Sequence, residues 1–539
     1  MYGSITLENR FGVNKMELIS LKYAIFVIVL LVLYYCFPKK YRWYVLLAGS
    51  MAYYVIICKW YVLFIIFTIC TTYGSTIWID KLLKKQNAIV KSHKEDWDRQ
   101  TRKEYKEKGR KKRVAVMLFA LLCNFGILAF LKYIPYAGEL GLLLPLGISF
   151  YTFQSMGYVM DVYREIVEPE KNFFKVALFV SFFPQIIQGP IAIYDKLAGQ
   201  LYEGHSLRLE NLQKGALLVL WGVMKKLVIA DRAVNIINFV MDKPMDFSGT
   251  YVFFAAVVYA LQLYADFSGG IDIVRGIAEM FGITMSTNFN HPYFSRSLTE
   301  YWHRWHMTLG DWCRNYIFYP LSISKRFLNF GKWLKPRFGA HISKVLPGCI
   351  ASVITFIVIG VWHGANMKYL YFGLWNGIVI MLAELFAPVN KKVAGGFFKL
   401  TGLREKGIFA TIISVLWTFM LILVGYYFDI AANASTAFHM LFKSVTDFHI
   451  SELGINNIIL NLGACGLDKY DILLLIICTL LWFFISFVEE NKKLDMRDFI
   501  LSRKLPLRWA IIYLGIFIVI IFGYYGPGVN PADFVYMQF

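Results

Sequence analysis

The sequence predicts an all-α membrane protein that crosses the bilayer several times, and three observations support this. Of its 539 residues, 58% are hydrophobic and only 17% are charged, and the mean hydropathy is +0.51. Apolar runs long enough to span a bilayer recur along the whole chain. The segments between them are polar and rich in Lys and Arg. We therefore expect one multi-spanning membrane domain over residues 1–539 and no water-soluble globule.

Each apolar run is a predicted helix, because backbone N–H and C=O groups inside a bilayer need partners within their own segment. The first run has no small-residue cleavage site, so we expect a retained span and not a signal peptide. We expect peripheral N-terminal spans in 1–140, the core in 141–390 and C-terminal spans in 391–539. The predicted helices are 16–37, 43–57, 61–79, 114–131, 142–162, 173–193, 212–229, 251–264, 271–281, 350–379 with a break, 408–428, 472–488 and 509–525.

The distribution of charge predicts on which side of the membrane each connecting segment lies. Segment 81–113 has fourteen Lys and Arg residues against five acidic ones, so it should be a cytoplasmic, solvated hairpin that also touches anionic lipid. The basic segments 324–344, 390–406 and 491–504 should lie on the same side, and 429–470 should lie outside. Both termini then lie outside. The formal net charge of +20 comes from such segments and does not indicate nucleic-acid binding.

The apolar run 350–379 is interrupted by the sequence WHGAN at 362–366. An ionisable ring in such a run costs about 2 kcal/mol or more unless it meets a partner or a water-filled cavity. Gly364 and Asn366 can turn the backbone, so we expect His363 at a break between two helices. We infer a catalytic cavity around His363. The alternative is a membrane-interface histidine that packs against the indole beside it.

Residues 297–320 read SLTEYWHRWHMTLGDWCRNYIFYP and predict one amphipathic helix. Ser297 can cap its start and Pro320 can end it. An apolar stripe recurs at three- and four-residue spacing, made by Trp302, Trp305, Leu309 and Trp312. This helix either lies on the cytoplasmic surface or dips into a cavity, and the density of indoles favours the cavity. Two arginines would then hold a phosphate or thioester donor with their planar forks of N–H groups. The polar face carries His303, His306, Gly310 and Arg314, with Arg304 beside it.

The sequence predicts neither a metal site nor a disulfide framework. His303 and His306 together with His363 have a spacing that permits zinc, but no carboxylate or thiolate is spaced to complete the ligand set. The eight cysteines are scattered, mostly in apolar runs, without a C-x-x-C pair. We therefore interpret them as small core residues.

Polar residues interrupt three further apolar stretches. YADFSGG at 264–270 places Asp266 between two runs, where its charge needs a partner, and a His or Arg from a neighbouring helix is the natural candidate. The alternative is a turn made by an Asp and two glycines. PLGISFYTFQ at 145–154 and FPQIIQGPI at 183–191 put Gly, Pro and Gln inside apolar runs. Such breaks are tolerated where the backbone lines a protein-walled or wet cavity.

Taken together, these motifs resemble the membrane-bound O-acyltransferase family, in particular its bacterial branch of alginate O-acetyltransferase-like proteins. The matching pieces also include NFNHPYFSRSLTEYWHRWHMTL at 288–309, RNYIFYPL at 314–321, VWHGAN at 361–366 and the C-terminal residues from 524 onward. The resemblance runs from about residue 145 to the C-terminus. The combined order of the motifs is specific, whereas any one of them alone is not.

The resemblance implies a helical body with re-entrant segments around a central funnel or tunnel between the two membrane faces. The family's active-site histidine matches His363, and its second position, Asn or His, matches His306. The chain departs from the family pattern at His303, where an arginine is common, and at Asn315, where an aspartate is common. Ten positions in these motifs are our candidates for binding the donor or the acceptor: Arg304, Trp305, Arg314, Asp266, Tyr264, Ser268, Gln154, Gln185, Asn288 and Asn366.

What the resemblance implies about function is O-acyl transfer, with no tightly bound cofactor. The donor would be acetyl-coenzyme A or an acyl-carrier thioester in the cytoplasm, and His363 would act as the base. The acyl group would cross the bacterial cytoplasmic membrane to an extracellular or cell-wall polysaccharide. An extracytoplasmic partner acetyltransferase would complete the modification.

Two alternative functions stay open. The nearest is D-alanyl transfer to teichoic acids, for which the basic segment 324–344 would dock an acidic carrier protein. The long outer segment 429–470 favours the polysaccharide branch instead. The other alternative is a transporter or flippase for a lipid-linked glycan, because buried His, Asp and Arg also mark substrate paths in transporters. Transporters of that kind often show internal repeats, and we find none in this chain.

Overall fold

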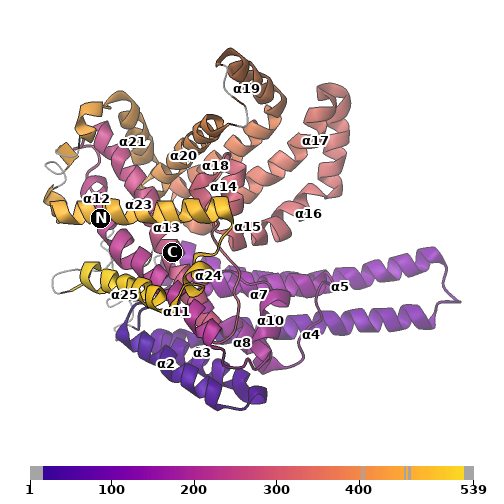
Figure 1. The fold of residues 1–539 in the computed structure, drawn as a ribbon. Helices are drawn as coiled ribbons and strands as arrows, with labels where there is room; N and C mark the ends of the chain where they lie inside the picture. The colour runs from indigo at the N-terminus through magenta and orange to yellow at the C-terminus, as the bar shows by residue number, and fades with distance from the viewer. Residues whose placement is uncertain are drawn as a thin grey trace. The chain divides into compact units, whose positions relative to one another are not determined.

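The computed structural model describes residues 16–401, 404, 407–454, 457–458, 463–526 and 534. Over these residues it contains helices and no strand (Figure 1). The chain divides into two compact units: unit 1 consists of residues 1–219 and 273–286, and unit 2 of residues 220–272 and 287–539. Except for 524–526 and Phe534, the C-terminal part of the motif resemblance lies outside the described residues.

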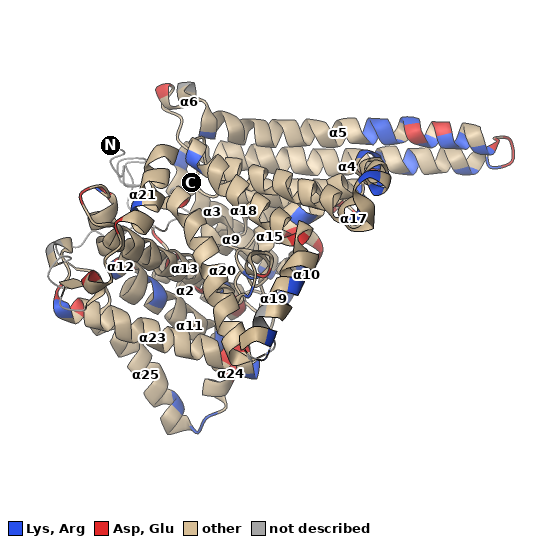
Figure 2. Ribbon diagram, turned by 90° about the horizontal axis from the view of Figure 1, so that it is seen from above, with Lys and Arg blue, Asp and Glu red and all other residues tan. Residues whose placement is uncertain are grey.

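Unit 1 is built around the long antiparallel pair α4 and α5. The segment 81–113 is therefore largely helical, and Lys and Arg gather toward the connection between the two helices (Figure 2). The connection is held by Asp98, whose side chain accepts from Thr101 N at 2.8 Å, and by Arg102, which donates to Lys94 O at 2.7 Å. The helices of unit 1 are α2 (Leu21–Cys36), η1 (Lys39–Tyr41), α3 (Arg42–Cys58), η2 (Lys59–Tyr61), α4 (Val62–Ser92), α5 (Arg99–Tyr133), α6 (Pro135–Glu139), α7 (Ile148–Tyr163), α8 (Phe173–Ser181), α9 (Phe183–Gln188) and α10 (Tyr194–Tyr202).

Unit 2 holds most of the remaining helices, and α11 (Leu209–Met224) and α13 (Gly249–Met280) contribute to both units. The basic segment 324–344 is not a loop, because it is part of α17, which kinks at Gly339 with φ +80°. The helices of unit 2 are η3 (Lys225–Ala230), α12 (Asp231–Met241), η4 (Pro292–Phe294), α14 (Leu298–Arg304), α15 (Met307–Cys313), η5 (Arg314–Phe318), α16 (Tyr319–Ser322), α17 (Lys325–His363), α18 (Met367–Leu385), α19 (Ala387–Thr401), α20 (Ile408–Ile430), α21 (Ala434–Thr446), η6 (Ile450–Leu453), η7 (Gly463–Cys465), α23 (Lys469–Lys492), α24 (Met496–Leu501) and α25 (Leu505–Phe522).

Seven helical segments among the described residues are long and apolar enough to cross a membrane, or eight if the bent pair α18–α19 counts as one span. The expected all-α class with multiple spans is thereby confirmed. The predicted helices 142–162 and 173–193 are too long. The first begins only at Ile148, and the second bends at Phe182 and ends at Gln188.

The break expected around YADFSGG is wrong, because α13 runs through it as one helix of 32 residues. The two glycines make no turn. A Cβ atom added at Gly269 would lie 2.8 Å from the carbonyl oxygen of Gly222. This position is therefore a glycine because another backbone passes close to the helix, a reason that the local sequence does not reveal.

The single helix expected over 297–320 is also wrong. Ser297 does cap α14, since its side chain accepts from Glu300 N at 3.1 Å. The helix nevertheless stops at Arg304, and α15 starts at Met307. Between them His306 takes φ +43° and ψ +52°, the left-handed region that non-glycine residues enter rarely.

Candidate active site

His306 is held in place by an extended segment that precedes α14. The carbonyl oxygen of Asn288 accepts from Met307 N at 2.9 Å, and Asn290 N donates to Arg304 O at 3.0 Å. These two bonds bracket the kink that carries His306. They satisfy backbone groups that the interrupted helix leaves open, which makes the left-handed residue tolerable.

The side chain of Asn288 orients the imidazole of His306. Its Oδ1 atom accepts from Thr308 N at 3.1 Å and from Thr308 Oγ1 at 2.9 Å, and it lies 3.2 Å from His306 Nδ1. A backbone N–H can only donate, so the Asn288 atom is the oxygen and Nδ1 of His306 carries the proton. In the neutral ring Nε2 is then left with its lone pair.

The His306 ring is buried and sits among other rings. The Phe267 ring meets it edge to face, with centroids 4.9 Å apart, and the Trp362 ring lies 6.3 Å away. Burial, with a smaller contribution from the nearby His363, lowers the pKa of His306 from its ordinary value to about 3. His306 is therefore neutral at physiological pH.

His363 ends α17, as the WHGAN motif predicts. Gly364 follows it, and α18 begins at Met367 with Asn366 as its N-cap, whose side chain accepts from Lys368 N at 3.1 Å. A Cβ atom at Gly364 would lie 2.6 Å from the Tyr369 ring, so close packing favours a glycine here. The predicted break at this histidine is confirmed.

The two histidines line the same pocket, although they come from different elements. The pocket has about 20 Å³ of free space, enough for a water molecule but not for an acyl chain. Its polar lining is completed by Tyr301, Tyr426, Asn376 and Asp429, and its apolar lining includes Trp302, Trp305 and Phe372.

Hydrogen bonds order the polar side of this pocket. Tyr301 and Tyr426 share a bond of 2.8 Å between their hydroxyls. Trp302 Nε1 donates to Asn376 Oδ1 at 2.9 Å. Tyr259 donates to Asp429 Oδ2 at 2.6 Å. These groups come from four helices, so the polar lining is assembled only by the tertiary fold.

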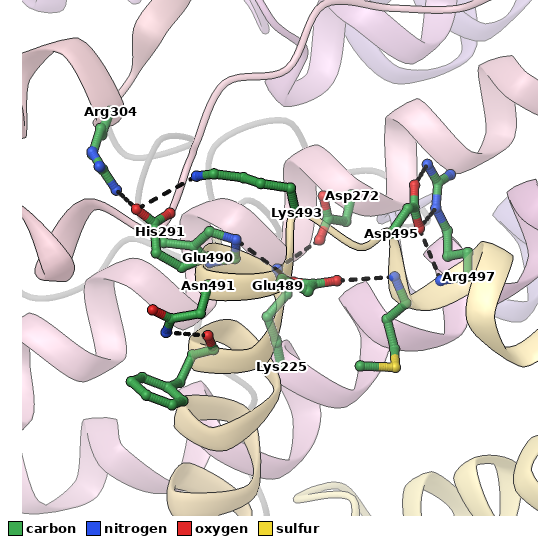
Figure 3. A network of polar contacts seen from close by, with 12 residues as sticks. Lys225, Asp272, His291, Arg304, Glu489, Glu490, Asn491, Lys493, Asp495 and Arg497 are labelled. Carbon is green, nitrogen blue, oxygen red and sulfur yellow. Dashed lines mark hydrogen bonds and ion pairs between the residues drawn. The ribbon is translucent and has the colours of Figure 1, made fainter.

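The predicted donor-binding arginines do not line the pocket. Arg304 pairs with Glu300 at 2.7 Å and with Glu490 at 3.0 Å, and Arg314 pairs with Asp311 (Figure 3 shows the Arg304–Glu490 pair). Carboxylates thus already balance both guanidinium charges. Their assignment to an anionic donor stays a prediction.

Asp266 does have a charged partner, but it is neither the His nor the Arg that we expected. Lys226 Nζ lies 2.6 Å from Asp266 Oδ1 and 2.9 Å from Asp231 Oδ1, and all three side chains are buried. The sequence carried a signal that we missed, namely two adjacent lysines inside the apolar run 212–229.

The remaining predicted residues fall into three places. Ser268 accepts from Lys225 Nζ at 2.8 Å. Tyr264 packs its ring against Trp305 and Trp482, and Asn366 donates to Ala432 O at 3.3 Å. None of these three lines the pocket.

Gln154 and Gln185 lie in unit 1, where they hydrogen bond to each other. Gln154 also donates to Phe179 O at 2.6 Å and Gln185 to Pro190 O at 3.0 Å. Both glutamines are buried. The two motifs that contain them pack together at Gly147, where φ is +70° and an added Cβ atom would lie 2.2 Å from Ile186 O.

Comparison with known proteins bears on the same segment. Residues 169–335, which include His306, match the sequence model of the family described as MBOAT, membrane-bound O-acyltransferase family. Over this segment, which is less than half of the chain, the sequence is similar to that family. Together with the apolar helices, this match makes the chain a multi-pass membrane protein.

The chain is also similar to proteins of named activity. It is 31% identical over 315 residues to the probable alginate O-acetylase AlgI of Pseudomonas syringae pv. tomato, covering 58% of this chain and 54% of that protein. It is 29% identical over 314 residues to the peptidoglycan O-acetyltransferase of Helicobacter pylori, covering 51% and 56%. The teichoic acid D-alanyltransferase of Bacillus subtilis is 26% identical over 288 residues, covering 52% and 67%. The chain spans little more than half of the length of the first two relatives.

Proposed function

We propose that this protein is an O-acyltransferase that transfers an acetyl group from a thioester to a hydroxyl of an extracellular or cell-wall polysaccharide. One observation carries the proposal: His306 and His363 line one pocket, although they are far apart in the sequence. The MBOAT match and the relatives named for alginate and peptidoglycan O-acetylation support the reaction class and the kind of acceptor.

In the proposed step, the acceptor hydroxyl oxygen attacks the thioester carbonyl carbon and gives its proton to the imidazole of His363. The C–S bond then breaks, and the departing sulfur takes the proton from the imidazolium. The products are the O-acyl ester and the free thiol, and His363 is neutral again. His306 Nε2, which keeps its lone pair, accepts a hydrogen bond from a neighbouring hydroxyl of the acceptor glycan and thereby orients the acceptor.

The pocket constrains how substrates enter. Its free space of about 20 Å³ is smaller than an acetyl thioester, so side chains that line it have to move when the donor binds. The donor is acetyl-coenzyme A or a carrier-linked thioester that enters from the cytoplasm, and the acceptor is reached from outside. The protein then lies in the bacterial cytoplasmic membrane with both termini outside and works with an extracytoplasmic acetyltransferase.

The test uses the full chain in proteoliposomes with [14C]acetyl-coenzyme A on one side. The other side holds alginate or peptidoglycan fragments and an extract of extracytoplasmic proteins that supplies the partner acetyltransferase. Label should enter the glycan with the wild-type protein and not with His363→Ala. Movement of glycan without incorporation of label would support a flippase instead. Incorporation only from a D-alanyl carrier protein into teichoic acid would support the D-alanyltransferase alternative.

A further inference from the structure

Two adjacent lysines hold α13 on either side of Phe267. Lys226 Nζ lies 2.6 Å from Asp266 Oδ1, and Lys225 Nζ lies 2.8 Å from Ser268 Oγ. Asp266, Phe267 and Ser268 are consecutive on α13. The lysines therefore bond to the two residues that flank one aromatic side chain.

The lysines come from η3, a short π-helical turn between α11 and α12. The extra residue in such a turn re-aims side chains, and π-helical turns often occur at functional sites. Lys225 also reaches Asp272 Oδ2 at 2.7 Å (Figure 3). Lys226 Nζ additionally lies 4.5 Å from the Phe534 ring centroid.

Removing the charges of this cluster from water costs free energy, which the contact between the two helices has to offset. Both lysines and the carboxylates of Asp231 and Asp266 are almost fully removed from solvent, and Asp272 is partly buried. Apolar residues of the same volume commonly stabilise such a contact equally well, so a buried ionic cluster is weak evidence for a role in stability. Its hydrogen bonds do fix the rotation of α13 at this point.

That rotation determines where the Phe267 ring lies. The ring is fully buried and meets the His306 ring edge to face at 4.9 Å and the Phe289 ring at 4.9 Å. Asn288 holds one nitrogen of His306, and Phe267 packs against the ring itself. A rotation of α13 would therefore move the imidazole.

We propose that Lys225 and Lys226 are positioning residues for acyl transfer, which hold Asp266 and Ser268 so that Phe267 keeps the His306 ring in its reactive orientation. This inference rests on the proposed function. A displacement of reacting groups by about 1 Å lowers a rate by as much as about a hundredfold. Loss of the contact between Phe267 and His306 should therefore lower kcat measurably.

The test avoids replacing Lys226, because Asp231 and Asp266 would then lose their shared cation and the fold would be strongly destabilised. Ser268→Ala removes one hydrogen bond of Lys225, and Ser268→Thr restores the hydroxyl. Asp272→Glu is the matched control, because it keeps a carboxylate beside the buried Lys225 and leaves residues 266–268 untouched. Phe267→Leu removes the ring contact with His306.

The first readout is acetyl transfer from [14C]acetyl-coenzyme A in proteoliposomes. Ser268→Ala and Phe267→Leu should each lower kcat about tenfold with KM within about twofold, and Ser268→Thr should restore kcat. The double variant Ser268→Ala/Phe267→Leu should be no slower than Phe267→Leu, because both changes act through one ring. Asp272→Glu should stay within about twofold of the wild type.

The second measurement is chemical labelling of His306, and it does not depend on acetyl transfer. Diethyl pyrocarbonate modifies neutral imidazoles, and peptide mass spectrometry gives its rate at His306. That rate should rise in Ser268→Ala and Phe267→Leu and not in Asp272→Glu. Unchanged labelling, or additive losses of kcat in the double variant, would overturn the inference. If the wild type transfers no acetyl group, the proposed function fails for this donor, and the labelling still decides the positioning role.

Discussion

Two regions of the molecule place polar side chains inside apolar sequence, and they use them differently. In unit 1, Gln154 and Gln185 hydrogen bond to each other and to nearby carbonyl oxygens. In unit 2, His306 and His363 line a pocket. A polar residue in an apolar run therefore does not identify a chemical site by itself. What distinguishes the two regions is whether the polar atoms face one another or face a cavity.

The largest expected effect is on the chemistry of unit 2. His363→Ala should lower kcat for acetyl transfer about a thousandfold, equivalent to about 4 kcal/mol of activation free energy, because the proton acceptor is lost. Radiolabel transfer in proteoliposomes measures this. Thermal unfolding in detergent is the control and should be unchanged, since His363 is only partly buried. A variant that keeps its activity would remove His363 from the mechanism.

Two substitutions of His306 should separate the effect of its side chain on kcat from the effect of its left-handed backbone conformation on stability. Asn enters the left-handed region readily and Val does not, so His306→Asn should fold while His306→Val should be less stable by about 2 kcal/mol. His306→Asn should still lower kcat about ten- to a hundredfold, because it cannot supply the same acceptor atom. Thermal unfolding and kinetics of the two variants check this, and equal stability would contradict the strain at φ +43°.

The free energy of unfolding should depend on pH because folding lowers the pKa of His306. This pKa is about 3 in the folded protein and about 6.5 in the unfolded chain. Below pH 6.5 the unfolded state binds a proton that the folded state does not, so stability falls as the pH falls toward 3. Between pH 7 and pH 5 the loss should be about 2 kcal/mol. Chemical denaturation at several pH values measures the slope. The slope should flatten in His306→Asn, and an identical slope in that variant would refute the assignment.

The smallest expected kinetic effect is in unit 1. Gln185→Leu deprives Gln154 and Pro190 O of a donor, so stability should fall by about 1–2 kcal/mol. If the glutamines only hold the interior together, kcat should change less than about twofold in the fraction that remains folded. Thermal unfolding and acetyl transfer measured on the same preparation decide this. A large loss of kcat at unchanged stability would instead support the donor-binding role predicted from the motif.

Local features of the sequence were enough to predict much of this protein. Composition and apolar runs determined the all-α membrane class, because hydrophobic length alone limits which segments can cross a bilayer. Ser297 as a cap and the break after His363 were predictable because both depend on a few neighbouring residues. The catalytic role predicted for His363 came from the broken apolar run and the motif resemblance, and that predicted for His306 came from the polar face of 297–320 and the same resemblance.

Only the tertiary structure decided which distant groups meet. The lysine that neutralises Asp266 is 40 residues away, and Gly269 is explained by a helix that crosses beside it. The kink at His306 depends on Asn288, which lies before α14. A periodic pattern reports which side of a segment is buried, whereas the partner of a buried charge or the cause of a kink depends on what other elements bring to that point in space.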